Sequence, residues 1–282
     1  MSQDGIRDLL HAAAEQLREA GVDGARLDAR ILLARAMAIS REALIAASRQ
    51  PNPGEVATFR TWVARRKGRE PLAYIIGHKE FWSLDFKVGP GVLVPRPESE
   101  TIIEAALAAL PDHAVPYAIA DLGTGSGALL LAALKEFPNA HGIGFERSPE
   151  ALRYAQANLR SLGFDGRGKI AAGDWNQAPA QGFDLILSNP PYIPSAEIDT
   201  LAPEVRLFEP RAALDGGPDG LDAYRDLARL LPRLLRPGAL AVLELGHGQA
   251  GLVEPLFESL NVLHVAPDLA GIPRALVLKR PK

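Results

Sequence analysis

Cysteine is absent from this sequence of 282 residues. Disulfide bonds, thiolate metal sites and cysteine nucleophiles are therefore excluded. The N-terminal residues Met1, Ser2, Gln3 and Asp4 do not begin the cationic and apolar pattern of a signal peptide. No apolar run approaches the roughly 20 residues that a membrane-spanning helix needs. We therefore expect a soluble, cytoplasmic protein with no membrane partner.

An excess of basic residues is also lacking, since 31 Lys and Arg stand against 34 Asp and Glu, for a formal net charge of −3. A chain without an overall positive field does not gather nucleic acid by electrostatics alone. Hydrophobic residues make up 47% of the chain and charged residues 23%, which is ordinary for a globular protein. We expect a monomer with no metal ion and no direct nucleic-acid partner.

The first 68 residues show the spacing of short amphipathic helices. Two apolar stripes recur at three- and four-residue steps: Ile6, Leu9, Leu10, Ala13 and Leu17, then Leu27, Ile31, Leu32 and Met37. Ser40 is expected to cap a third helix, and Pro53 to open a fourth. Because no such helix buries its apolar stripe alone, residues 1–68 are predicted to form a small bundle. This bundle contains no chemical motif, so we expect it to dock a substrate.

Residues 69–97 are expected to form a hairpin and linker. The partial alternation of apolar and polar residues over 80–88 suits a short β-hairpin. Pro90, Gly91, Pro95 and Pro97 then punctuate a stiff connector. The catalytic domain is expected to cover residues 98–282.

Strand and helix patterns alternate from residue 118 onward. Strands are predicted over residues 118–122, 141–145, 169–172, 183–187, 239–245 and 274–278, and helices over 129–136, 149–162 and 221–235. Repeated βα units form a mostly parallel, doubly wound sheet with helices on both faces. We therefore predict an α/β fold of Rossmann-like type, preceded by the helical bundle and the hairpin.

A glycine-rich loop follows the first of these strands. Its sequence runs Asp121-Leu122-Gly123-Thr124-Gly125-Ser126-Gly127-Ala128. Glycines permit a tight turn and the close approach of a ligand to the helix behind the loop. The same glycines match the dinucleotide pattern G-x-G-x-x-G/A, so the loop alone does not identify its ligand. Asp121 favours an ammonium group over a pyrophosphate, because an anion attracts the first and repels the second.

Polar residues also follow the next two strands. Glu146 stands where nucleotide-binding sheets place a carboxylate against ribose hydroxyls, and a carboxylate can accept both hydroxyl hydrogens. Asp174 can accept from the exocyclic amine of an adenine, while the Trp175 indole packs on the ring face. Alone, each of these is more often a surface acid or a core aromatic.

The fourth strand ends in Ser188-Asn189-Pro190-Pro191-Tyr192, the most specific motif in the chain. Two consecutive prolines fix φ and cannot pair in a sheet, so the strand stops and the loop is stiff. The Asn189 amide and the Pro190 carbonyl are then held as acceptors for a planar NH₂ group. All four motifs are expected at the carboxyl ends of successive parallel strands, which is where such sheets bind ligands.

Taken together, these motifs resemble the class I S-adenosylmethionine-dependent methyltransferases of the HemK/PrmC group, the peptide chain release factor glutamine methyltransferases. The resemblance covers nearly the whole chain. It includes residues 71–81 and 95–100, which are similar to the hairpin and linker of that family, and residues 208–211 and 219–221. Glu146 stands where the family usually has Asp, and Ser99 replaces a more familiar Thr.

The resemblance implies S-adenosyl-L-methionine as cofactor and a release factor as protein substrate. The methyl group would go to the side-chain amide nitrogen, N5, of the glutamine in a Gly-Gly-Gln motif. Cofactor contacts would come from Asp121, Gly123, Thr124, Gly125, Ser126, Gly127, Glu146, Asp174, Trp175 and Asn189. The target glutamine would be held by Asn189, Pro190, Pro191 and Tyr192, of which Asn189, Pro190 and Tyr192 would act in catalysis.

Other functions stay open on the sequence. A ribosomal-protein glutamine methyltransferase shares the same tetrapeptide. An adenine-N6 nucleic-acid methyltransferase also shares it, but would want a basic groove and stacking aromatics, whereas the chain after residue 68 has a net charge of −6. A non-catalytic adaptor that only binds the cofactor would not need Asn189 to Tyr192 intact. A nicotinamide dehydrogenase gives no role to Asp121 or to the prolines.

Overall fold

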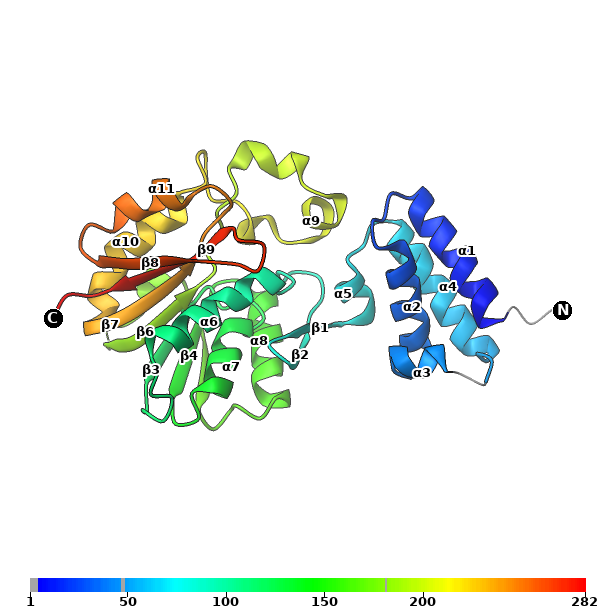
Figure 1. The fold of residues 1–282 in the computed structure, drawn as a ribbon, viewed down its shortest axis with the longest axis horizontal. Helices are drawn as coiled ribbons and strands as arrows, with labels where there is room; N and C mark the ends of the chain where they lie inside the picture. The colour runs from blue at the N-terminus through cyan, green and yellow to red at the C-terminus, as the bar shows by residue number, and fades with distance from the viewer. Residues whose placement is uncertain (1–4, 47–48, 181) are drawn as a thin grey trace. The chain divides into compact units, whose positions relative to one another are not determined.

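The computed structural model describes residues 5–46, 49–180 and 182–282. Residues 1–4, where we expect no signal peptide, lie outside the described residues. The chain divides into two compact units, the first made of Met1–Gly77 with Ala202–Phe208 and the second of His78–Leu201 with Glu209–Lys282. Figure 1 shows that the first unit is helical and that the second is built on a sheet flanked by helices. In the described ranges, no helix is long and apolar enough to cross a membrane.

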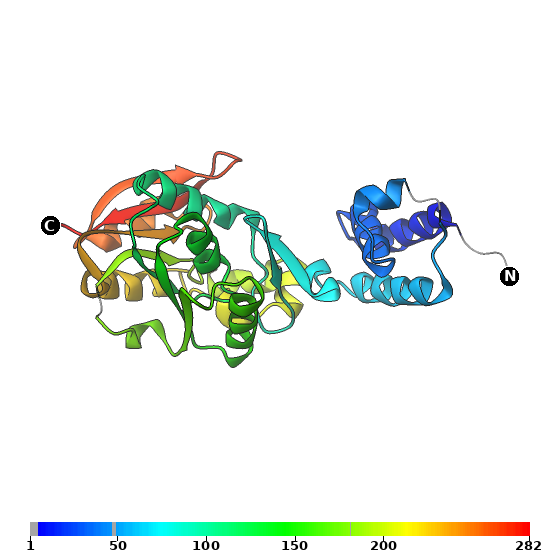
Figure 2. The same ribbon diagram turned by 90° about the horizontal axis from the view of Figure 1, so that it is seen from below.

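The first unit contains the four predicted helices. They are α1 (Ile6–Glu19), α2 (Ala25–Ala36), α3 (Arg41–Ile45) and α4 (Pro53–Lys67), followed by a short α5 (Leu72–Ile76) that the sequence pattern did not predict. The expected caps are confirmed, because Ser40 Oγ accepts a hydrogen bond from Ala43 N and α4 begins at Pro53. Leu17, Leu32 and Phe59 are fully buried between these helices. Figure 2 shows the ribbon of the helical unit from below.

The predicted stripe of α2 is wrong at one position. Leu27 is 51% exposed, and the buried face runs through Asp28, Ala29 and Leu32 instead. An acid can lie on that face because Asp28 accepts a hydrogen bond from Arg66 Nε at 2.7 Å. Apolar spacing alone does not reveal a buried ion pair of this kind.

A segment distant in sequence also belongs to the first unit. The helix α9 (Pro203–Phe208) carries Glu204, whose carboxylate accepts from Arg66 at 2.9 Å and from Arg69 at 2.6 Å. Burial acts to raise the pKa of Glu204, but hydrogen bonds, among them those from Arg69 and Arg66, together hold this pKa below its ordinary value. These charged contacts make residues 202–208 part of the helical unit, although they follow the fourth strand of the sheet.

The second unit begins with a hairpin and continues as a seven-stranded sheet. The hairpin pairs β1 (His78–Phe81) with β2 (Leu84–Lys87), as predicted. The sheet has the order β5-β4-β3-β6-β7-β9-β8, with β3 (Ala118–Leu122), β4 (His141–Glu146), β5 (Gly168–Ala172), β6 (Phe183–Ser188) and β7 (Leu235–Glu244) all parallel. The strand order reverses between β3 and β6, which places a topological switch point at their carboxyl ends.

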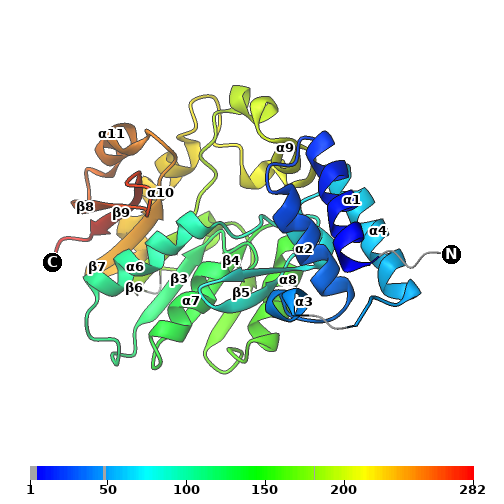
Figure 3. The same cartoon turned by 45° about the vertical axis from the view of Figure 1, so that its right-hand side comes forward.

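Helices cover both faces of the sheet. The helices α6 (Glu100–Ala109), α7 (Ala128–Glu136) and α8 (Pro149–Ser161) lie on one face, and α10 (Asp222–Leu234) and α11 (Ala250–Val253) lie on the other, as Figures 1 and 3 show. Tyr224, Leu227 and Leu231 of α10 are fully buried against strand residues such as Leu243. The predicted doubly wound α/β fold is therefore confirmed.

The antiparallel edge of the sheet contains a strand that the sequence pattern missed. The strands β8 (Asn261–Pro267) and β9 (Pro273–Lys279) pair with each other, and β9 also pairs with β7. The central residues of β9 are buried, whereas most of β8 is exposed. An exposed edge strand shows no apolar alternation, so periodicity gives no signal for it.

Candidate active site

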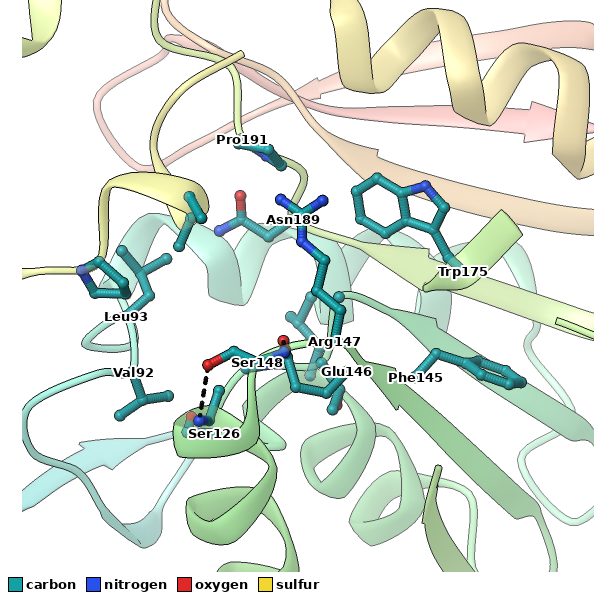
Figure 4. Close-up of a pocket in the computed structure, with 18 of the residues that line it drawn as sticks. Val92, Leu93, Ser126, Phe145, Glu146, Arg147, Ser148, Trp175, Asn189 and Pro191 are labelled. Carbon is teal, nitrogen blue, oxygen red and sulfur yellow. Dashed lines mark hydrogen bonds between the residues drawn. The ribbon is translucent and has the colours of Figure 1, made fainter. Parts of the chain in front are cut away.

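A cavity of about 330 Å³ lies at the carboxyl ends of β3, β4, β5 and β6. Its volume is within the range of small-molecule sites. Figure 4 shows Asn189 and Pro191 at one side of it, Trp175 at another, and Val92 and Leu93 opposite Trp175. The four motifs that the sequence singled out are therefore brought together by the parallel register of the strands.

The glycine-rich loop forms one wall of the cavity. Gly123 has a φ of 77°, and a Cβ added there would lie 3.0 Å from the Trp175 ring. Gly125 has a φ of 57°, and a Cβ there would meet nothing within 4 Å. These positions need glycine for two reasons, because the left-handed conformation disfavours side chains and because Gly123 lets the indole approach the backbone.

Glu146 connects this loop to the end of β4. Its Oε2 accepts from Gly125 N at 2.9 Å, and its Oε1 accepts from Ser148 N at 2.8 Å. The residue is 9% exposed and still lines the cavity. A carboxylate has about four acceptor positions, so each oxygen can accept a further bond from a ligand hydroxyl.

Asp121 lies behind the loop, near the end of β3. Its Oδ2 accepts from Thr124 Oγ1 at 2.5 Å and from Leu130 N at 3.2 Å, while Oδ1 has no hydrogen-bond partner among the described residues. Burial raises the pKa of Asp121 to about 7, against the opposing effect of the bond from Thr124. An unsatisfied, buried carboxylate oxygen of this kind fits an ammonium group on a ligand.

Asp174 and Trp175 supply the wall after β5. Asp174 Oδ1 accepts from Asn176 N at 2.8 Å, which orients the carboxylate. Its Oδ2 lies 3.9 Å from an Arg147 nitrogen, and both residues line the cavity. Trp175 packs partly against the core beneath α10 and exposes part of its ring to the cavity. An aromatic face beside an acceptor is suited to a purine base.

Asn189 is connected to a buried network. Its Nδ2 donates to Ser99 Oγ at 3.1 Å, and Ser99 Oγ donates to Glu244 Oε2 at 2.5 Å. The Tyr192 hydroxyl donates to Glu244 Oε1 at 3.2 Å. Burial raises the pKa of Glu244 to about 6, and burial beside Glu244 raises the pKa of Tyr192, so the phenol stays protonated at neutral pH.

Most of the predicted site residues line this cavity. They are Gly123, Thr124, Gly125, Ser126, Glu146, Asp174, Trp175, Asn189 and Pro191. The lining residues do not include Asp121, Gly127, Pro190 or Tyr192. Gly127, Pro190 and Tyr192 are each next in sequence to a lining residue, and Asp121 accepts a hydrogen bond from the lining residue Thr124. The functional roles of all of them stay predictions.

Several residues that shape the site had no role predicted for them, although Ser99 was noted as a departure from the family pattern. Ser99 and Glu244 form the network around Asn189 and Tyr192. Glu209, which is 6% exposed, accepts from Arg96 Nη2 at 2.5 Å and from Val94 N at 3.2 Å. Burial raises the pKa of Glu209, an effect that the charge of Arg96 opposes. The segments 95–100 and 208–211 stood out in the sequence because their charged residues lie beside prolines. Nothing in the sequence indicated that Arg96 of the first segment pairs with Glu209 of the second.

Comparison with known proteins agrees with this arrangement. A family model described as "PrmC N-terminal domain" matches residues 8–77, and one described as "Methyltransferase domain" matches residues 116–259. A methyltransferase structure from Pyrococcus furiosus, 18% identical, covers 79% of this chain and 98% of that chain with a TM-score of 0.53, which is a likeness of fold alone. The fold and the site thus define a class I, S-adenosylmethionine-dependent methyltransferase.

Two relatives share one name. A "Release factor glutamine methyltransferase" of Rhodospirillum rubrum is 46% identical over 275 residues, which cover 96% of this chain and 84% of that protein. Another, of Caulobacter vibrioides, is 44% identical over 256 residues, which cover 90% of this chain and 88% of that protein. The chain belongs to the release factor glutamine methyltransferase family.

Proposed function

We propose that this protein transfers a methyl group from S-adenosyl-L-methionine to the side-chain amide nitrogen of a glutamine in a peptide chain release factor, in the cytoplasm. The observation that carries the proposal is the position of Asn189 and Pro191 in the same cavity as Gly123 to Ser126, Glu146 and Trp175. This arrangement supports the proposal, because it would hold an amide next to an adenosine-containing cofactor.

The residues fit that cofactor chemically. Asp121, directly behind the glycine-rich loop, would attract an ammonium group by its charge, Glu146 offers acceptors to ribose hydroxyls, and Trp175 offers a ring face to adenine. When bound, S-adenosylmethionine supplies an electrophilic methyl group on a positively charged sulfur. The substrate nitrogen is a weak nucleophile, because its lone pair is delocalised into the amide carbonyl.

Asn189 Oδ1 and the Pro190 carbonyl would accept the two hydrogens of the glutamine NH₂ and fix the direction of its lone pair. Orientation of this kind contributes up to about 7–11 kcal/mol in favourable cases. Tyr192 would pack beside the planar amide, with its hydroxyl held by Glu244. As the nitrogen takes the methyl group, the methyl–sulfur bond would break and its electron pair would stay on sulfur. The N–H then becomes acidic, so its proton can leave to water.

Incubation with labelled cofactor tests the function directly. Purified release factors, ribosomal proteins and DNA or RNA containing adenine would be compared as acceptors, and the modified residue would be mapped by mass. We expect label on one glutamine of a release factor. Label on a ribosomal protein or on adenine would assign one of the alternative substrates, and cofactor binding without transfer to any acceptor would indicate an adaptor.

Replacing Glu146 is expected to weaken cofactor binding. The Glu146→Ala variant should lose about 1.5–3 kcal/mol of binding free energy, the range for charge-assisted hydrogen bonds. Calorimetry with S-adenosylmethionine measures the loss. Glu146→Asp is the matched control, because it keeps the carboxylate on a shorter side chain. Unchanged affinity in the alanine variant would remove Glu146 from the site.

Cofactor affinity should also depend on pH through Asp121. The raised pKa of about 7 means that Asp121 is protonated below neutrality, whereas an ammonium group binds its ionised form. Affinity should therefore fall as pH drops from 7 to 5.5, by up to about tenfold per pH unit when one proton is linked to binding. Calorimetry over this range measures the slope, and Asp121→Asn should abolish it. An equal slope in both proteins would place the titrating group elsewhere.

The helical unit is proposed to dock the protein substrate. A chain beginning near Arg69 should bind cofactor with unchanged affinity, methylate a short glutamine peptide at the parent rate, and methylate the intact release factor far more slowly. Glu204→Ala in the full chain is the control, since it removes the contacts with Arg66 and Arg69 without removing the helices. Equal rates of the truncated and full chains on the intact protein would contradict this role.

A further inference from the structure

Three segments of the second unit meet around one buried carboxylate. Ser99 precedes α6, Asn189 and Tyr192 follow β6, and Glu244 ends β7. Glu244 is 1% exposed and Ser99 is 5% exposed. The hydrogen bonds run from Asn189 Nδ2 to Ser99 Oγ, from Ser99 Oγ to Glu244 Oε2, and from the Tyr192 hydroxyl to Glu244 Oε1.

The direction of these bonds follows from the chemistry of the groups. An ionised carboxylate only accepts, so the single proton of the Ser99 hydroxyl is directed to Glu244. The side of Ser99 Oγ that faces Asn189 then offers only lone pairs. The NH₂ end of the Asn189 amide can satisfy these lone pairs, and the carbonyl end cannot. With Nδ2 committed to Ser99, Oδ1 is the amide atom left to accept a bond in the cavity.

We propose that Ser99 and Glu244 are positioning residues, which fix the Asn189 amide so that Oδ1 rather than Nδ2 meets the NH₂ group of the substrate. The proposal rests on the function proposed above. In the opposite orientation, the Asn189 NH₂ would face the substrate NH₂, and two donors cannot form a hydrogen bond. The serine and the buried acid therefore determine whether the stiff Asn-Pro-Pro-Tyr loop presents an acceptor or a donor.

The orientation depends on the charge of Glu244, which several groups influence. Tyr192 and Ser99 donate to its carboxylate, Arg274 of β9 attracts it, and Glu98 repels it. The Tyr224 hydroxyl of α10 donates to its backbone carbonyl at 2.8 Å. When Glu244 takes up a proton below about pH 6, it can donate to Ser99, and Ser99 can then donate to the Asn189 carbonyl. The amide is no longer held in one orientation.

The test compares Ser99→Ala, Ser99→Thr and Glu244→Gln in single-turnover methylation at saturating cofactor, so that the titration of Asp121 does not contribute. Ser99→Ala should lower the rate about tenfold or more, by analogy with loss of an orienting polar group. Ser99→Thr keeps the hydroxyl and should restore most of the rate. Calorimetry should show cofactor affinity within twofold of the parent in all three. The parent rate should fall below about pH 6, and this fall should be absent in Glu244→Gln.

A second readout does not require activity. The side-chain NH₂ resonances of Asn189, followed by NMR in the cofactor-free protein, should titrate with a midpoint near pH 6 and should not titrate in Glu244→Gln. The proposal would be overturned if Ser99→Ala methylated as fast as the parent, or if Ser99→Thr were as slow as Ser99→Ala. An Asn189 titration that persists without Glu244 would also overturn it. If the parent methylates no glutamine, the proposed function fails, whereas the NMR titration still decides whether the network orients Asn189.

Discussion

Asn189→Ala is expected to reduce the single-turnover rate of methylation by a factor on the order of 10²–10³, by analogy with removal of one orienting polar group. The variant removes an acceptor for the substrate NH₂, so the nitrogen can rotate away from the methyl donor. Folding should be little affected, because Asn189 lies in a loop at the edge of the sheet. Rapid-quench assays with saturating release factor and cofactor measure the effect.

Asn189→Asp separates the role of the amide oxygen from that of the amide NH₂ group. It keeps an acceptor at Oδ1 and loses the NH₂ group that donates to Ser99. Ser99 already gives its proton to Glu244, so a second carboxylate facing Ser99 would be repelled. We therefore expect Asn189→Asp to be nearly as slow as Asn189→Ala. A much faster aspartate variant would mean that only the acceptor matters, and a parent rate in the alanine variant would overturn the proposed mechanism.

The fold could be predicted in detail where short strands lie between glycine or proline and a helical segment. The strands β3, β4, β5 and β6 begin and end within one residue of their predicted limits, because glycine or proline beside each short strand defines its ends. The strand β8 was missed because its exposed edge carries no such pattern. The assignment of residues 202–208 to the helical unit was also not predictable, since it depends on Glu204 meeting Arg66 and Arg69.

Some contacts of the site could likewise be predicted from the sequence, and others could not. Residues at the ends of successive parallel strands share one edge of the sheet, so Gly123, Glu146, Trp175 and Asn189 could be placed together from their order alone. The contact between Ser99 and Glu244 joins positions 145 residues apart. A glutamate at the end of an apolar strand gives no sign of its partners, because those partners are set by how α6 packs on the sheet.

The second large effect is expected on stability, at Tyr224 of α10. This side chain is fully buried in the core beneath the site, and its hydroxyl donates to the Glu244 carbonyl at 2.8 Å. Tyr224→Ala should lower the free energy of unfolding by about 3–5 kcal/mol, the range for removing a large buried aromatic side chain. Scanning calorimetry measures the shift of the transition that belongs to the sheet-containing unit.

Tyr224→Phe separates the two contributions of this side chain. It preserves the packed ring and removes only the hydroxyl, so the Glu244 carbonyl loses its donor in a dry environment. A buried acceptor left without a partner costs about 1–3 kcal/mol. We therefore expect the phenylalanine variant to unfold at a temperature between those of the parent and the alanine variant. Equal losses in the two variants would show that the hydrogen bond, rather than the packing of the ring, determines the stability at this position. A parent-like transition in Tyr224→Ala would contradict the burial of the ring against β7.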